Sequence, residues 1–132
     1  MLWKLCALDP VTANVRWIFS AQRDNSNTKP CVGRGKVFFT SSDYHCYALL
    51  PDDGSILWKY NARGSIYSFP SLCGDRLVIG DEKGVLTCLN ADTGALVWEK
   101  ELGMPLSRSP VICGDIMIAS GCDGLFALRS RR

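Results

Sequence analysis

The most reactive side chains of this sequence are a single histidine and seven cysteines. His45 directly precedes Cys46, and an imidazole beside a thiol can form an activated nucleophile. Both residues fall in a strand-like segment, where neighbouring side chains point to opposite faces of a sheet. They therefore cannot meet through the dipeptide, and we interpret His45 as a structural residue at a turn.

The spacing of the cysteines indicates packing rather than metal binding or redox chemistry. No two of them are separated by the two residues typical of a zinc site or a redox motif. Cys73 and Cys113 both precede Gly-Asp, and most of the others lie in apolar segments, where a thiol behaves as a small hydrophobic group. We expect reduced thiols in a cytoplasmic protein, and a disulfide framework is the alternative.

Other patterns that could hold a ligand are incomplete. Gly33-Arg34-Gly35 lacks the full spacing of a phosphate-binding loop and precedes no helical pattern, so we interpret it as a turn. The aspartates lie mostly at turns, where short polar side chains cap backbone groups. The sequence predicts no catalytic, cofactor-binding or metal-binding residue and no cofactor.

Composition and charge restrict the class of protein and of partner. The 132 residues are 47% hydrophobic and 21% charged, which is typical of a globular chain. A formal net charge of +2 is too small to indicate a nucleic acid or a membrane surface as partner. No apolar run is long enough to span a bilayer, and the 2–8 stretch, interrupted by Lys4, does not resemble a signal peptide. We expect a cytoplasmic protein that contacts neither nucleic acid nor membrane.

The elements that must position these side chains repeat along the chain. Trp17, Trp58 and Trp98 are 41 and 40 residues apart, and three prolines (Pro30, Pro70 and Pro110) recur every 40 residues. A period of 40 to 45 residues held by two kinds of marker indicates one structural unit that is copied several times.

Each copy is composed of short strands separated by turns. In the last copy, residues 107–112 read as a first strand, and 116–120 as a second strand buried on both faces. Residues 125–128 begin a third strand, and the middle copy continues into a fourth, 95–100, after a hairpin turn at 90–94. In the first turn Ala13 occupies the usual glycine position, so we expect Asn14 to supply the left-handed conformation.

Four short antiparallel strands in 40 residues are typical of a propeller blade. We predict an all-β fold, a partial β-propeller of four-stranded antiparallel blades, as one repeat region over 1–132. Its parts are a half blade at about 1–20, blades at about 28–60 and 66–100, and an incomplete blade at about 106–128. Ordinary propellers close with four to eight blades, so we expect a piece of a larger protein, with self-association as the alternative.

A recognisable pattern is carried by Tyr47-Ala48-Leu49 followed by Trp58, and by Cys88-Leu89 followed by Trp98. It includes an Asp-x-Thr-Gly-like turn and a later Ser-x-Pro strand. The pattern resembles the PQQ-like β-propeller repeat of quinoprotein alcohol dehydrogenases over nearly the whole chain. The resemblance implies that Trp17, Trp58 and Trp98 dock neighbouring blades, as large flat side chains that bury much apolar area.

The same resemblance points to quinone-dependent dehydrogenase chemistry as one function to test against the residues. Such enzymes carry adjacent cysteines near the cofactor, a calcium ion held by acidic and amide side chains, and an aspartate base. This sequence has no Cys-Cys dipeptide, and its aspartates are at the turns of the repeats. We therefore expect no enzyme activity from the chain by itself.

The favoured function is that of a non-catalytic scaffold whose partners are proteins or the remaining blades of a longer chain. Lys29, Arg63 and Arg108 lie near the starts of first strands and are candidates for a binding surface at the channel or rim. The cysteine-rich strands and Gly121-Cys122-Asp123-Gly124 also resemble the propeller tail of acyl-adenylating enzymes of the β-alanine-activating type. An accessory tail of such an enzyme and a dehydrogenase fragment are the alternatives.

Overall fold

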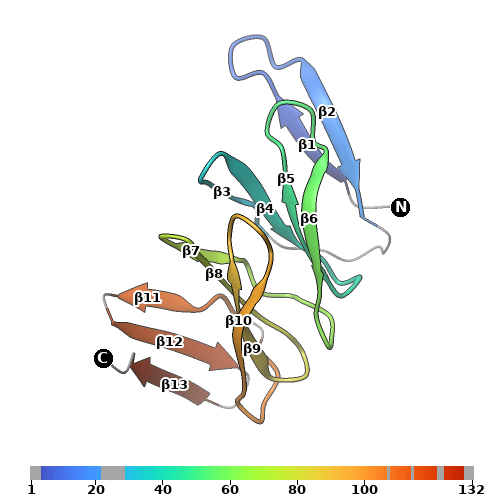
Figure 1. The fold of residues 1–132 in the computed structure, drawn as a ribbon. Helices are drawn as coiled ribbons and strands as arrows, with labels where there is room; N and C mark the ends of the chain where they lie inside the picture. Colours follow the sequence, from blue (N-terminus) through green and yellow to red (C-terminus); the bar gives the residue numbers. More distant parts are fainter. Residues whose placement is uncertain (1–3, 22–28, 107, 114, 122–123, 130–132) are drawn as a thin grey trace.

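The structure, a computed structural model, describes residues 4–21, 29–106, 108–113, 115–121 and 124–129. These residues form strands and turns only, which confirms the all-β expectation. The strands make four antiparallel sheets that follow one another along the chain, from β1–β2 at one end to β11–β13 at the other (Figure 1).

The two central sheets have four strands each, in sequential order. Their strands are β3 (Cys31–Gly33), β4 (Lys36–Thr40), β5 (His45–Leu49), β6 (Ile56–Asn61), then β7 (Ser71–Cys73), β8 (Arg76–Gly80), β9 (Val85–Asn90) and β10 (Leu96–Glu101). The end sheets hold β1 (Lys4–Leu8) and β2 (Val15–Ser20), and β11 (Val111–Cys113), β12 (Ile116–Gly121) and β13 (Gly124–Arg129). The first strands β3, β7 and β11 lie side by side, and β6 and β10 lie on the opposite side (Figure 1).

The first strands are shorter than the sequence predicts. The predicted first strand of the last copy, 107–112, begins before Pro110, and its residue 107 lies outside the described residues; β11 begins directly after Pro110, and β7 likewise begins directly after Pro70. Proline has no backbone N–H for a ladder bond, so pairing starts at the next residue. The segment before β7 is held by a side chain instead. The backbone N–H of Phe69 donates a hydrogen bond to Ser109 Oγ at 2.8 Å.

Strands β8 and β9 are buried between two sheets over most of their length, as expected of inner strands of stacked blades. Strand β12 was predicted to be buried on both faces, and this is wrong. Only Ala119 is fully buried in it, and Ile118 is 41% exposed. The reason is its place in the last sheet, where the described residues cover β12 from one side.

The turn of the first hairpin also differs from the prediction. Ala13 itself adopts the left-handed conformation, with φ of 61°, and Asn14 does not. The turn is fixed by the Ala13 N–H, which donates to the Asp9 carbonyl at 2.8 Å, and by Asp9 Oδ1, which accepts from the Val11 N–H at 2.8 Å. The repeat geometry thus imposes the glycine conformation on an alanine at this position.

Candidate functional site

Between the first two sheets, Trp17 of β2 lies against the turn that precedes β6. A Cβ atom added to Gly54 would lie 2.6 Å from the Trp17 ring, so the indole rests directly on the glycine. The Trp17 Nε1–H donates to the Pro51 carbonyl at 2.7 Å. Phe19 follows two residues later and packs edge-on against Tyr47. This junction between blades is filled by aromatic rings.

The next junction repeats the arrangement one blade along. Trp58 of β6 lies on Gly94, whose added Cβ would be 2.6 Å from the ring, and its Nε1–H donates to the Ala91 carbonyl at 3.0 Å. Phe38 and Trp58 have ring centroids 6.0 Å apart. Tyr60 packs against the same buried cluster.

A cluster of charges closes the rim of this second junction. Asp92, in the turn beside Gly94, accepts hydrogen bonds from Arg34 at 2.6 Å and from Lys36 at 3.1 Å. Arg34 and Lys36 come from the β3–β4 hairpin of the preceding sheet, Arg34 from its turn and Lys36 from β4, so the three side chains join two blades. Their hydrogen bonds and positive charges hold the pKa of Asp92 well below its usual value of 3.8.

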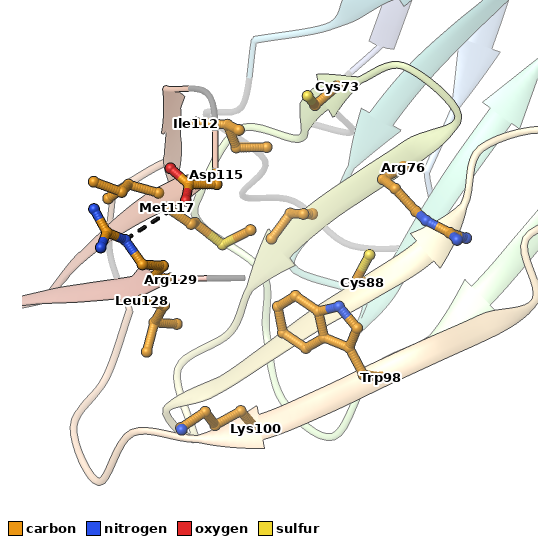
Figure 2. A pocket seen from close by; sticks show the side chains of 12 residues that line it. Cys73, Arg76, Cys88, Trp98, Lys100, Ile112, Asp115, Met117, Leu128 and Arg129 are labelled. Carbon is orange, nitrogen blue, oxygen red and sulfur yellow. Dashed lines mark ion pairs between the residues drawn. The ribbon is translucent and has the colours of Figure 1, made fainter. Parts of the chain in front are cut away.

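The third junction is open. Trp98 of β10 is 38% exposed, and its indole N–H makes no hydrogen bond within the part of the chain that the structure describes. It borders a cleft of about 520 Å³ between the third and fourth sheets (Figure 2). The lining comes from both sheets: Cys73, Arg76, Val78, Cys88, Trp98 and Lys100 on one side, and Ile112, Asp115, Ile116, Met117, Leu128 and Arg129 on the other.

Smaller and polar side chains stand at repeat-equivalent positions beside this cleft. The positions of Phe38 and Tyr60 in the filled junction correspond, forty residues on, to Val78 and Lys100 in the open one. An aromatic ring is thus replaced by a branched aliphatic group, and a second ring by a flexible ammonium side chain. Trp58 is covered mainly by the turn 90–94, and the corresponding turn after β13 lies outside the described residues.

Basic side chains predominate around the cleft. Arg76, Lys100 and Arg129 line it, together with Asp115 as an acidic residue. Arg129 lies 3.6 Å from Asp115, the ion pair drawn in Figure 2. Arg76 is 3.7 Å from the carboxylate of its neighbour Asp75, at the exposed edge of the sheet. The cleft therefore combines an apolar floor with a basic rim.

The three predicted rim residues are not joined to one another by any hydrogen bond or ion pair within the described residues. Arg63 lies in the connection after β6, and its guanidinium reaches Glu99 and, at 3.1 Å, Glu101 on the outer strand β10. Lys29 and Arg108 are exposed. Their binding role stays a prediction.

The histidine and the buried thiols fit structural roles. His45 Nδ1 lies 2.9 Å from the Asp43 carbonyl, at the turn before β5. Cys46 is fully buried, and desolvation raises the pKa of its thiol well above the usual value, which keeps it protonated. Among the described residues, no group of three or more histidine, cysteine or carboxylate side chains is placed to hold a metal ion.

Sequence reasoning missed the serines that join the inner strands. Ser68 is buried, accepts from the Gly80 N–H at 3.1 Å and donates to the Gly80 carbonyl at 2.7 Å. Ser71 Oγ donates to the Pro110 carbonyl at 2.5 Å. The repeated Ser-x-Pro pattern was the available signal, because a serine beside a proline can replace the ladder bond that proline lacks.

The family described as outer membrane protein assembly factor BamB matches residues 3–71 and 63–129 of the chain. The BamB protein of Shewanella oneidensis is 34% identical over 64 residues, which are 48% of this chain and 16% of that protein. The crystal structure of BamB from Moraxella catarrhalis superposes with a TM-score of 0.83 at 25% identity, covering 96% of this chain and 40% of that one.

A quinohemoprotein alcohol dehydrogenase from Pseudomonas putida also superposes, with a TM-score of 0.78 at 17% identity over 88% of this chain and 21% of that one. At that identity the likeness shows the fold alone. The predicted fold, a partial β-propeller of PQQ-like repeats, is confirmed. The chain spans well under half the length of each of these three proteins.

Proposed function

The chain belongs to the PQQ-like repeat family described as outer membrane protein assembly factor BamB, and from this we propose that it is a non-catalytic propeller module that binds protein partners. The observation that carries the proposal is the pair of docked junctions. Trp17 and Trp58 each donate a hydrogen bond to a turn of the next blade and hold the blades in a fixed array. A rigid array that presents its exposed side chains in a fixed arrangement suits binding.

An exposed pair of aromatic side chains supports the same function. Tyr67 and Phe69 are 45% and 40% exposed, although both lie in a segment whose backbone is held by hydrogen bonds. Ser68, between them, is fully buried and bonded to Gly80, so the two rings are presented on a fixed support. Aromatic side chains that are rigid and exposed are favourable anchors at protein interfaces because little conformational entropy is lost on binding.

The experiment is crosslinking in the source cells, followed by reconstitution with the purified partner. A photoreactive amino acid at position 67 should crosslink to a defined polypeptide, and the same group at Lys59, exposed on β6, serves as the control. In the purified complex, Phe69→Ala should weaken binding about tenfold, and Leu57→Ala should not. Leu57 is a matched control because it is also an exposed apolar residue, 45% accessible. Equal crosslinking at both positions, with no complex formed in vitro, would contradict the proposal.

We also propose that the chain has no dehydrogenase activity of its own. The test adds pyrroloquinoline quinone, calcium and an alcohol to the purified chain and measures dye reduction. We expect no calcium-dependent rate above that of the mixture without protein. A saturable rate would establish the dehydrogenase alternative instead.

The accessory tail of an acyl-adenylating enzyme stays as a second proposal, because the buried free thiols Cys46 and Cys88 lie on the cysteine-rich strands that suggested it. Sequencing transcripts that contain this reading frame tests it, since adenylation motifs upstream would place the module on such an enzyme. Cytoplasmic location and absence of membrane contact stay predictions. Within the described residues no helix is long and apolar enough to cross a membrane. The matched relatives are named as outer membrane assembly factors, so cell fractionation should accompany the crosslinking.

A further inference from the structure

We propose that the exposed rings of Tyr67 and Phe69, together with the basic side chains beside them, bind an acidic segment of a partner protein. The inference rests on the proposed function and states which chemical class of partner this surface takes. The basic side chains are Lys29, Lys83 and Arg108, all exposed, and with the two rings they form the aromatic–basic surface.

The two rings are exposed at a connection whose neighbouring sheets are both described. On one side, Thr40 Oγ1 of the preceding sheet donates to the Ser68 carbonyl at 2.8 Å. On the other side, the Phe69 N–H donates to Ser109 Oγ, just before the following sheet, at 2.8 Å. Ser68 is fully buried, so the side chains of Tyr67 and Phe69 point outward on either side of it. Their exposure therefore belongs to this connection within the array.

The basic side chains lie around the same connection. A Cβ atom added to Gly64 would lie 2.8 Å from Lys83 Cγ, so the stem of this lysine rests on the connection itself. Arg108 is next to the serine that accepts from the Phe69 N–H. Lys29 occupies the position of Phe69 one repeat earlier, and it precedes β3, which lies beside β7 (Figure 1). Positive charge thus comes from the sheets on both sides of the rings and from their own sheet.

The carboxylates of the β8–β9 turn bond to backbone groups, which leaves the positive charge at the surface. Asp81 is only 2% exposed, and its Oδ1 accepts from the backbone N–H groups of Lys83 and Val85 at 2.9 Å and 3.1 Å. The neighbouring Glu82 accepts from the Ser65 N–H at 3.2 Å. Acidic and basic residues alternate in the sequence of this turn, but the lysine is its exposed charged residue.

Ion pairing separates the aromatic–basic surface from a nearby basic group. Arg63, in the same connection, is paired with Glu99 and Glu101 of β10. The three basic side chains of the aromatic–basic surface have no carboxylate partner within the part of the chain that the structure describes. Unpaired charges of one sign attract a ligand of the opposite sign and orient it, while the rings supply apolar contact area.

These charges favour a protein as the ligand. Single-stranded nucleic acids also bind to basic grooves with aromatic rings. A formal net charge of +2 gives little attraction to a phosphate backbone, however. A polypeptide segment in which aspartate or glutamate alternates with apolar residues matches both the rings and the cations.

The test uses two synthetic peptides as probes. The acidic peptide repeats Glu-Leu-Asp four times, and the control peptide has lysine at every acidic position. The full chain is labelled with 3-fluorotyrosine, the resonance of Tyr67 is assigned with Tyr67→Phe, and each peptide is titrated by fluorine NMR. We expect a saturable shift of the Tyr67 resonance with the acidic peptide only. The resonance of Tyr47, which is buried, should not move.

Charge reversal makes the result specific. Lys83→Glu and Arg108→Glu should each weaken binding of the acidic peptide about three- to tenfold. Arg16→Glu, the same reversal at an exposed residue of β2, should leave the affinity unchanged. Added salt should weaken binding to the original chain, because exposed charges are screened. Affinity that ignores the first two reversals, or that falls equally with Arg16→Glu, overturns the proposal.

Two further outcomes would name a different occupant. Single-stranded oligothymidylate of the same charge as the acidic peptide is titrated in parallel, and tighter binding of the oligonucleotide overturns the proposal. A shift of the Tyr67 resonance that depends on chain concentration without any peptide shows a second copy on this surface and also overturns it.

Failure of this experiment is distinguishable from failure of the proposed function. If the crosslinked partner binds in vitro and Phe69→Ala weakens the complex while Lys83→Glu and Arg108→Glu do not, the rings bind an uncharged surface. The proposed function then stands and this inference fails. If neither a partner nor the acidic peptide binds, the proposed function itself fails.

Discussion

Replacing Gly94 by alanine should destabilise the chain much more than replacing Gly74, although both glycines have left-handed backbones. Their φ angles are 75° and 58°, so each substitution introduces similar backbone strain. An alanine Cβ at position 74 meets no atom within 4 Å, whereas at position 94 it would lie 2.6 Å and 2.7 Å from atoms of the Trp58 ring. The two variants therefore separate backbone strain from the loss of indole docking.

The structure gives the magnitudes. Left-handed strain costs an alanine about 1–2 kcal/mol, which is the whole expected effect of Gly74→Ala. Gly94→Ala adds overpacking against the ring, about 1–3 kcal/mol more. Ala13 shows that the repeat tolerates an alanine at the equivalent position, with φ of 61°, where its side chain is exposed.

The assay is urea unfolding of both variants, together with the same pair in a Trp58→Ala background. With a slope of about 2 kcal/mol per M, the extra cost at position 94 should lower the midpoint by about 1 M relative to Gly74→Ala. Without the indole, the two substitutions should cost the same, so the double-mutant cycle should return a coupling of about 1–3 kcal/mol. Equal midpoints for the two single variants, or an excess cost at position 94 that persists without the indole, would refute the docking account.

Three further predictions follow from the same contacts. Trp58→Ala should lower the free energy of unfolding by about 3 kcal/mol, whereas Trp98→Ala should lower it by less than about 1 kcal/mol, because only the Trp58 indole is docked. Calorimetry of both variants measures the losses, and equal losses would contradict this difference. Because the pKa of Asp92 is lowered in the folded state, its ionised form stabilises the fold above about pH 4, and this contribution is lost as the pH falls below that. Asp92→Asn should therefore weaken the fall of the melting temperature at acidic pH. An unchanged fall would contradict the role of the ion cluster. The buried thiol of Cys46 should resist alkylation at pH 8 in the native chain while the exposed thiol of Cys73 reacts, and mass spectrometry of the labelled peptides would reveal any reversal.

The repeat could be predicted from sequence because its markers are large and regularly spaced. The indoles and prolines fixed the period, and the period placed the strands and the glycine turns. The starts of the first strands were predicted wrongly because strand pairing begins only after the proline. Before the proline, serine side chains make the hydrogen bonds, and an apolar strand pattern gives no sign of them. Exposure of Ile118 was missed for a different reason: an apolar run predicts two covered faces, but whether a second sheet covers the strand is decided elsewhere in the chain.

The glycine partners of the docked tryptophans were not predicted because each contact joins two blades. Each docked tryptophan meets its glycine 36 or 37 residues later, so neither residue alone tells whether the contact forms. Beside Trp98, the residues equivalent to Phe38 and Tyr60 are Val78 and Lys100, a difference that appears only when the copies are aligned position by position. The residues that repeat build the array, and those that depart from the repeat set the shape and charge of the surface beside Trp98.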